Sequence, residues 1–385
     1  MKIAILGYGT VGKGVVKILE ERFPHFEIVK IVVHSEKDCL DERFTTNFYE
    51  IFDYDVDVLM EMIIGDSPTY EYIRYALSQC IHVITSNKTT VACHLEEYMK
   101  LAKENHCQFR YEASVAGGIP WIQGLIKAKR IDKIERIEGI LNGTTNYILD
   151  HMLKEDRDYT EILKDAQRLG YAESNPSADV DGIDALRKIC ISSSLGYNIR
   201  VNTDEVDCFG ISTVKLNDLK KFKNEGLLIK LMGYSHFENN KFYACVEPVL
   251  VSSISKYAAV DENNNAVSLY GNTIGELMFI GQGAGQAPTA NAMIQDLLDI
   301  NDRRYDGECI LVDSVIDRGD TLNNYVFCMN EDQSMIFEEK IDFVEKVDER
   351  YYITLKPSTV EEKNKWIKEL RNANCEFFYA RRRVL

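Results

Sequence analysis

Short apolar runs alternate with helix-patterned segments over the first 110 residues. Residues 2–6 form an apolar run that ends at a glycine, and the segment after it, VGKGVVKILEERF, has its apolar residues on one helical face. EIVKIVVH, VDVLMEMII and HVITS are further apolar runs, and YIRYALSQC has a helical pattern. Because strands and helices alternate, this region predicts an α/β fold with a parallel, doubly wound sheet. CQFRYEAS predicts one more strand before the glycine-rich VAGGIP.

The pattern changes after residue 126. KIERIEGILNG predicts a strand, TNYILDHMLK predicts a helix, and KFYACVEPVLV and AVSLYG predict further strands, which together indicate an α+β domain with an open sheet. The helix-patterned end of GQGAGQAPTANAMIQDLLDI is expected to pack back on the first domain. We therefore expect a first domain at 1–126 with a return helix at about 285–300, a second domain at 127–284, and a small α+β C-terminal domain at 301–385.

Composition excludes several classes of partner. The net charge of −16 and the pI near 5.0 argue against nucleic acid and against an anionic membrane surface. The ten cysteines stand singly, without metal-ligand spacing, which is typical of reduced thiols. Since the sequence also has no apolar run of the length of a signal peptide or a membrane span, we expect a cytoplasmic protein.

Three glycines follow the first predicted strand directly. Gly7, Gly9 and Gly12 form GYGTVG at the start of the first helix, where they allow a tight turn and the approach of a pyrophosphate to the helix N-terminus. The alternative is a turn whose glycines serve only strand–helix packing. An acid at the tip of the second strand would favour NAD. This strand ends at His34 and Ser35, and with Lys37 these residues suit a 2′-phosphate, so both NADP and NAD stay open.

Two more loops contain candidate residues. Lys88 follows the strand HVITS, and the carboxyl ends of parallel strands face the ligand crevice, which places this lysine near a bound cofactor. A solvated surface lysine is the alternative. In YEASVAGGIP, from Tyr111 to Pro120, the glycines mark a tight bend or a close approach, and a hinge between domains is the simpler interpretation.

The stretch from Tyr171 to Lys188, YAESNPSADVDGIDALRK, contains four carboxylates. Asp184 and Lys188 stand four residues apart, so they share one face of a helix that is apolar nearly all round and is therefore predicted to be buried. Burial shifts the pKa values of such groups. The crowded acids suit a substrate ammonium group, although Asp179 or Asp181 can also serve simply as a helix cap.

Seven motifs together identify the chain as similar to the homoserine dehydrogenases: GYGTVGKGV, EMIIGDSP, TSNKTTVA, YEASVAGGIP, GILNGTTNYIL, LGYAESNPSADVDGIDALRK and GQGAGQAPTA. The resemblance covers roughly residues 1–300. It implies oxidation of L-homoserine to L-aspartate 4-semialdehyde with NAD(P), or the reverse reduction, in the threonine and methionine branch from aspartate. The alternatives are another Rossmann-type dehydrogenase of an amino-acid semialdehyde and a catalytically silent metabolite-binding relative.

The resemblance also implies residue roles. Asp184 and Lys188 match the catalytic pair, with Lys188 as the first candidate for the proton donor and Lys88 as the second. The expected dinucleotide-binding residues are Gly7, Gly9, Thr10, Val11, Gly12, His34, Ser35, Lys37, Lys88 and Gly283. The expected substrate-binding residues are Glu173, Asp179, Tyr171, Gly143 and Thr144. The positions whose backbone carbonyls match a monovalent cation site, usually sodium, are Glu112, Val115, Gly117 and Ile119. A homodimer or a higher homo-oligomer is expected.

The chain departs from the family pattern in three places. His34 and Ser35 stand where many members have an arginine and a following acidic or polar residue, which leaves the cofactor choice open. Ile64-Gly65 replaces the usual pair of glycines after the acid of the fourth strand. Residues 320–385 resemble only the second half of a regulatory ACT domain, because MNEDQSM contains no D-x-P-G loop. A structural or dimerising role of the tail is therefore as well supported as feedback inhibition by threonine.

Overall fold

The computed structural model describes residues 1–304, 310–317 and 322–383. The chain forms two compact units. Unit 1 consists of Met1–Ile134, Cys190–Thr203 and Leu269–Asp313, and unit 2 consists of Glu135–Ile189, Asp204–Ser268 and Ser314–Leu385. The division into three domains stays a prediction. In the described part of the chain, no helix has the length and apolar character that crossing a membrane requires.

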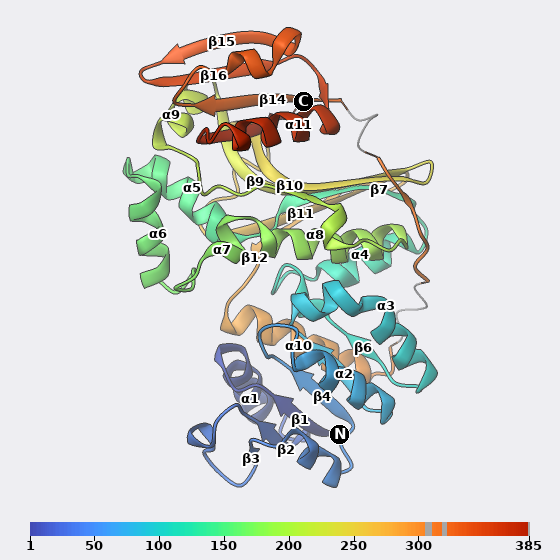
Figure 1. Ribbon diagram of the computed structural model, residues 1–385. Coiled ribbons are helices and arrows are strands. Elements are labelled where there is room, and N and C mark those ends of the chain that lie inside the picture. The colour runs from blue at the N-terminus through green and yellow to red at the C-terminus, as the bar shows by residue number, and fades with distance from the viewer. Residues whose placement is uncertain (305–309, 318–321, 384–385) are drawn as a thin grey trace. The chain divides into compact units, whose positions relative to one another are not determined.

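Unit 1 contains a six-stranded sheet in the order β3-β2-β1-β4-β5-β6 (Figure 1). All its neighbouring strands are parallel. The strands are β1 (Lys2–Leu6), β2 (Glu27–Val32), β3 (Phe44–Thr45), β4 (Val58–Glu61), β5 (His82–Thr85) and β6 (Phe109–Arg110). The order is that of the Rossmann fold, which confirms the predicted doubly wound sheet. The last predicted strand is shorter than expected, because the chain turns into a 3-10 helix at Glu112–Ser114.

Helices cover both faces of this sheet. They include α1 (Thr10–Arg22), α2 (Thr69–Ser78), α3 (Lys88–Glu104) and α10 (Gln286–Asn301), while α4 (Trp121–Lys129) and the strand β12 (Gly275–Gln282) complete the larger elements of unit 1. Helix α10, in the segment where a return helix was expected, packs against α1.

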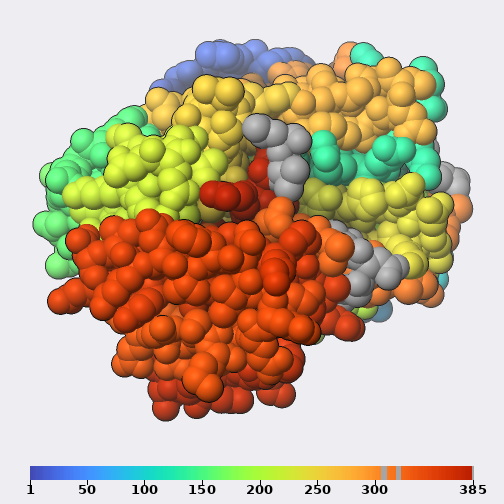
Figure 2. Space-filling view, turned by 90° about the horizontal axis from the view of Figure 1, so that it is seen from above, coloured from blue at the N-terminus to red at the C-terminus, as the bar shows by residue number. Residues whose placement is uncertain are grey.

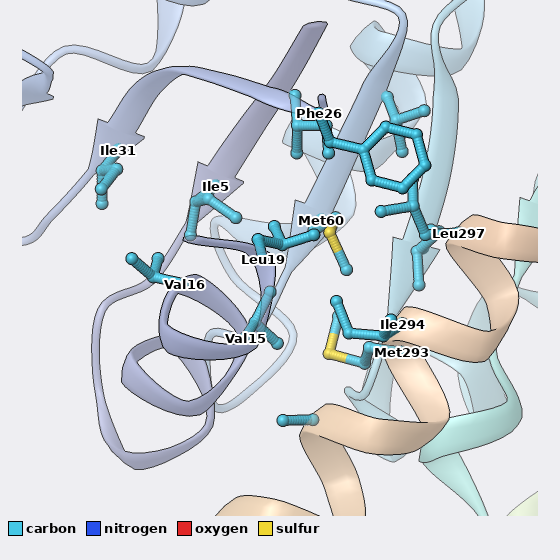
Figure 3. Close-up of a cluster of buried hydrophobic side chains, with 14 of the residues drawn as sticks. Ile5, Val15, Val16, Leu19, Phe26, Ile31, Met60, Met293, Ile294 and Leu297 are labelled. Carbon is cyan, nitrogen blue, oxygen red and sulfur yellow. The ribbon is translucent and has the colours of Figure 1, made fainter. Parts of the chain in front are cut away.

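The alternation of side chains along β1 divides the core of unit 1 into two layers. Ile5 points to the layer of α1 and α10, where it meets Val15, Leu19 and Met293 (Figure 3). Ile3 belongs to the same cluster of buried side chains. Ala4 and Leu6 belong to the opposite layer, with side chains of α2 and α3. Because successive residues of a strand face opposite sides, a continuous apolar run is needed where both faces are buried.

Unit 2 is built on a mixed sheet in which strands run in the order β11-β7-β9-β10-β18-β14-β16-β15. These strands are β7 (Ile134–Ile140), β9 (Leu227–Glu238), β10 (Lys241–Ser252), β11 (Asn264–Gly271), β14 (Leu322–Met329), β15 (Ile341–Val347), β16 (Arg350–Leu355) and β18 (Phe377–Arg382). The short strands β8 (Asp207–Cys208), β13 (Val315–Ile316) and β17 (Ser358–Thr359) lie beside them. The helices are α5 (Gly143–Glu155), α6 (Tyr159–Arg168), α7 (Ser177–Val180), α9 (Leu216–Asn224), α11 (Val360–Asn372) and α8 (Ile183–Tyr197), which begins in unit 2.

The described residues of the tail, 314–317 and 322–383, continue the sheet of unit 2. Strand β18 lies parallel to β10, with Arg381 opposite Val249. Buried Arg350 of the tail forms an ion pair with Asp218 of α9, with 2.6 Å between Nε and Oδ1. Figure 2 shows the tail, in orange and red, beside the yellow-green chain of the α9 region. The tail is therefore part of the same hydrogen-bonded sheet as β10.

Candidate active site

The glycine-rich turn between β1 and α1 is shaped by two different constraints. A Cβ atom added at Gly12 would lie 2.2 Å from the carbonyl oxygen of Gly7, whereas one added at Gly9 meets nothing within 4 Å. Gly7 has a φ of +99°, which other residues rarely adopt. Packing within the chain therefore requires Gly7 and Gly12, but it does not require Gly9. Gly9 caps the N-terminus of α1, a site whose free N–H groups favour an anion.

The loop after β2 presents charges of both signs. His34 and Lys37 are exposed, and the Ser35 hydroxyl accepts a hydrogen bond from the Lys37 backbone N–H at 3.3 Å. Glu36 and Asp38 lie in the same short 3-10 helix. The loop thus contains groups that suit a 2′-phosphate and groups that suit a ribose diol.

Gly283 lies close to the turn that contains Gly117. A Cβ atom at Gly117 would come within 2.5 Å of the carbonyl group of Gly283. Three residues further on, the Gln286 side-chain amide donates to the carbonyl of Thr10 at 2.9 Å. The first residue of α10 is thereby joined to the first residue of α1.

A buried acid that is absent from the predicted site residues lies beside the turn that contains Lys88. Glu61, at the carboxyl end of β4, is fully buried and accepts hydrogen bonds from the Ile63 backbone N–H at 2.6 Å and from the Thr85 hydroxyl. Loss of hydration raises the pKa of Glu61 to about 7. Asn87 caps α3 and donates to the carbonyl of Gly65 at 2.5 Å. Lys88 is the next residue, so its turn is fixed to the end of β4.

Glu61 carried a sequence signal, since it is an acid inside an otherwise apolar strand. Its partner Thr85 ends the neighbouring strand β5, 24 positions along the chain, and the backbone N–H of Asn87, two residues later, donates to the Thr85 hydroxyl. Only the pairing of β4 with β5 brings these residues together.

The predicted cation segment is buried within unit 1. The carboxylate of Glu112 accepts the backbone N–H groups of Ile122 and Gln123 at 2.9 and 2.8 Å, at the start of α4. Ala116 and Gly117 have consecutive left-handed φ angles of +59° and +53°. The side chain of Glu112 is thus engaged with α4, and its backbone carbonyl is the group that matches the predicted site.

In unit 2, the acid and the lysine of α8 form a buried ion pair. The exposed fractions of Asp184 and Lys188 are 3% and 5%, and 2.7 Å separates Lys188 Nζ from Asp184 Oδ2. The same ammonium group donates to the carbonyl oxygen of Leu141 at 2.7 Å. Both the shared helical face and its burial are as predicted.

Asn142 joins this pair to a second acid, and it is absent from the predicted site residues. Its side-chain amide donates to Asp184 Oδ2 at 2.9 Å and to Asp179 Oδ1 at 2.7 Å. The motif GILNGTTNYIL could have indicated this residue, because the asparagine directly precedes the predicted Gly143. A helix cap is the usual role of such a residue, and Asn142 does cap α5.

The remaining predicted substrate residues lie around the start of α5. The Thr144 hydroxyl donates to the backbone carbonyl of Tyr171 at 2.6 Å, and the ring of Tyr171 packs edge-on against Tyr147. Glu173 is exposed, and its backbone carbonyl accepts a hydrogen bond from Gln167 at 3.0 Å. The described contacts therefore bring Asp179, Asp184 and Lys188 together through Asn142, and they tie Tyr171 to Thr144.

A separate group of ionisable residues lies at the far end of α5. Asp150, His151 and Glu262 offer ligand atoms within 4.8 Å of one another. The ammonium group of Lys154 is 2.8 Å from Asp150 and 2.9 Å from Glu262. The lysine thus supplies the positive charge that these acids require.

Comparison with known proteins gives the same family over both units. Residues 7–112 match the model of the homoserine dehydrogenase NAD-binding domain, and residues 120–298 match the homoserine dehydrogenase model. The homoserine dehydrogenase of Bacillus subtilis is 40% identical over 314 residues, which cover 78% of this chain and 72% of that protein. The Synechocystis homoserine dehydrogenase is 37% identical, over 78% of this chain and 73% of the relative.

Solved structures of homoserine dehydrogenases also match this chain. A homoserine dehydrogenase from Thiobacillus denitrificans has a TM-score of 0.88 at 28% identity, covering 100% of this chain and 98% of the other. A hyperthermophilic archaeal homoserine dehydrogenase in complex with NADPH has a TM-score of 0.69 at 26% identity, over 79% and 98% of the two chains. The chain belongs to the homoserine dehydrogenase family.

Proposed function

We propose that this protein interconverts L-homoserine and L-aspartate 4-semialdehyde, with Lys188 as the proton donor in the reduction. As a member of its family, it is an oxidoreductase that acts on a small molecule with a nicotinamide cofactor. The observation that carries the proposal is the desolvated Asp184–Lys188 pair beside a second acid, Asp179. The other two possibilities, a different semialdehyde dehydrogenase and a silent relative, have no specific observation in their favour.

Different residues of unit 2 bind the two ends of the substrate. Asp179 and Glu173 attract the ammonium end of the amino acid. Gly143 and Thr144, at the start of α5, are the other predicted substrate-binding residues beside Tyr171. At the other end of the substrate, the Lys188 ammonium donates a proton to the aldehyde oxygen as hydride adds to the carbon. In the oxidation, the neutral amine of Lys188 accepts that proton. Asp184 orients the lysine throughout.

The residues of unit 1 fit a nicotinamide dinucleotide, which supplies the hydride. The start of α1 at Gly9 and Thr10 suits the pyrophosphate, and the loop of His34, Ser35 and Lys37 suits the adenosine ribose or its 2′-phosphate. Lys88, on its fixed turn, is the second candidate for the proton donor.

Oxidation of L-homoserine, followed by nicotinamide absorbance with NAD and with NADP in turn, tests the function. We expect turnover with at least one cofactor, and the ratio of the two kcat/KM values gives the cofactor preference. Tight binding of both nucleotides without turnover of homoserine would favour the silent relative. Turnover of a different amino-acid semialdehyde in place of aspartate semialdehyde would favour the other dehydrogenase.

The contrast between Gly9 and Gly12 gives a prediction about cofactor binding. Gly9→Ala is expected to leave the free energy of unfolding within about 0.5 kcal/mol of the unmodified protein, because the added methyl meets no atom of the chain. We expect it to weaken NADPH binding at least about tenfold, since the methyl occupies the space of the pyrophosphate. Urea unfolding and titration of NADPH fluorescence measure the two effects.

Gly12→Ala is the matched control for this prediction. Its methyl overlaps the carbonyl of Gly7, so we expect about 1–3 kcal/mol of destabilisation. Unchanged NADPH affinity in Gly9→Ala would place the pyrophosphate elsewhere.

We also propose a monovalent cation, sodium, on the backbone carbonyls of Glu112, Val115, Gly117 and Ile119. The carbonyls of Glu112 and Ile119 accept one N–H each, from Val115 and Trp121, and a carbonyl oxygen has a second lone pair for a cation. We expect a higher melting temperature in sodium chloride than in choline chloride at equal ionic strength. Equal melting temperatures in the two salts would contradict the site.

Two further proposals concern the whole protein. A homodimer or a higher homo-oligomer is proposed on the family resemblance, and light scattering after gel filtration tests it. A cytoplasmic location is proposed on the cysteine pattern and is tested by cell fractionation.

A further inference from the structure

We infer that Asn142 is a positioning residue of the reaction, whose side-chain amide holds the substrate-binding acid Asp179 and the lysine partner Asp184 in one arrangement. The inference rests on the proposed function, and it adds a residue to which no role in the reaction has been given above. Asn142 is buried, with an exposed fraction of 4%.

The hydrogen-bond partners of the Asn142 side chain determine the orientation of its amide group. The two hydrogen atoms of Nδ2 go to two different carboxylates, at 2.7 Å for Asp179 and 2.9 Å for Asp184. On the other side, Oδ1 accepts the backbone N–H of Thr145 at 2.8 Å. A flipped amide would direct its oxygen at both carboxylates and its NH₂ group at an N–H donor. Because only one orientation satisfies every partner, the amide sets the position of both acids.

The same segment of backbone also holds the lysine. The carbonyl oxygen of Leu141, one residue earlier, accepts from Lys188 Nζ at 2.7 Å and from the Asn265 side-chain amide at 2.9 Å. Asp184 Oδ2 accepts from both Lys188 and Asn142. The peptide at residues 141–142 is therefore a common anchor, through its carbonyl for the ammonium group and through its side chain for the carboxylate beside it.

The electrostatic consequence concerns Asp179. Lys188 is the counter-ion of Asp184, and the amide of Asn142 holds Asp179 close to that pair without adding charge. A carboxylate held in this way is ready for a substrate ammonium group. The amide thus links the groups proposed for the two ends of the substrate, which predicts that its loss changes both kcat and KM.

The test is a double-mutant cycle on homoserine oxidation. We expect Asn142→Ala to lower kcat about 100-fold and to raise KM for homoserine, because displaced groups no longer meet the reacting atoms. If the amide acts on kcat through Asp184, then Asn142→Ala changes kcat less than about twofold in an Asp184→Asn background. NADPH affinity is expected to stay within about twofold of the unmodified protein in all variants.

Asn142→Asp separates positioning from helix capping. An aspartate caps a helix as well as an asparagine, but it has no hydrogen atom to donate and adds a like charge beside two acids. We therefore expect a folded protein with kcat reduced at least as much as in Asn142→Ala. Asn47→Asp, the same change at another helix cap, in unit 1, is the matched control and should leave kcat unchanged.

Three results would count against the inference. Near-normal kcat and KM in Asn142→Asp would show that the residue is a helix cap only. Equal losses from Asn142→Ala in the unmodified and the Asp184→Asn backgrounds would show that it does not act through Asp184. Absence of homoserine turnover in the unmodified protein would overturn the proposed function and the role of Asn142 with it.

Discussion

Lys188→Met is expected to abolish homoserine turnover and to leave NADPH affinity unchanged. General acid–base catalysis by one positioned group contributes about 10²–10⁴-fold to a rate, so kcat should fall by about that factor. The substitution has a second effect, however. It leaves the carboxylate of Asp184 buried without its counter-ion, and breaking such a pair costs about 3–5 kcal/mol.

The double variant Asp184→Asn/Lys188→Met separates lost chemistry from lost folding. It removes both charges and keeps similar volumes, so we expect its free energy of unfolding to recover relative to Lys188→Met while turnover stays absent. Lys164→Met, the same change at an exposed position of α6, is the control for the substitution itself. Stopped-flow turnover, urea unfolding and NADPH titration give the three quantities.

Near-normal turnover in Lys188→Met would assign the proton to another group. Lys88 is then the first candidate, because its turn is fixed by Asn87 at the end of β4. In that case Lys88→Met should lose turnover and Lys188→Met should lose only stability.

Glu247→Gln is expected to destabilise unit 2 by about 3–5 kcal/mol. Glu247, on β10, is completely buried and faces two cations of the tail: Arg381 at 2.6 Å and Lys363 at 3.7 Å. The tyrosine hydroxyl of Tyr379 donates to the same carboxylate at 3.2 Å. A neutral amide removes the counter-charge that faces Arg381 in this desolvated site, and it leaves Lys363 with Asp207, 3.5 Å away. Urea unfolding monitored by circular dichroism measures the loss.

The pH dependence of stability should change in the same variant. Burial alone would raise the pKa of Glu247, but the charges of Lys363 and Arg381 outweigh this and hold the pKa below the ordinary 4.5. A lowered pKa in the folded state adds stability above pH 4.5 that is lost as the pH falls through the folded value. We therefore expect the acid-induced loss of stability to be shallower in Glu247→Gln than in the unmodified protein.

Glu225→Gln is the control for this prediction. Glu225 pairs with Arg382, the next residue along β18, but about a third of its side chain is exposed, so the expected loss is within about 1 kcal/mol. Equal losses in Glu225→Gln and Glu247→Gln would mean that the buried network does not join the tail to β10. A large loss at Glu247 alone would support the tail as a structural part of unit 2.

The pairing of the tail with β10 does not test the resemblance of the tail to part of an ACT domain. The sequence predicts the α+β character of the tail, because alternating and helical patterns are local. Arg381, Arg382 and Arg383 are three consecutive arginines in the tail. In the structure these arginines pair with Glu247, Glu225 and Glu138. These partners lie more than a hundred residues away in the sequence, so no local pattern around the arginines predicts the pairing.

The sequence by itself determined the parallel sheet, the glycine turn, the family and the burial of Asp184 beside Lys188. Each of these depends on spacing within one segment: two residues for a strand, four for a helical face, and the fixed intervals of a motif. The tertiary structure alone decided that Asn142 bridges two acids, that Glu61 lies beside the turn of Lys88, and that the tail shares a sheet with β10. These contacts join segments far apart in the chain, and hydrogen-bond geometry across such distances is set only when the strands and helices have packed.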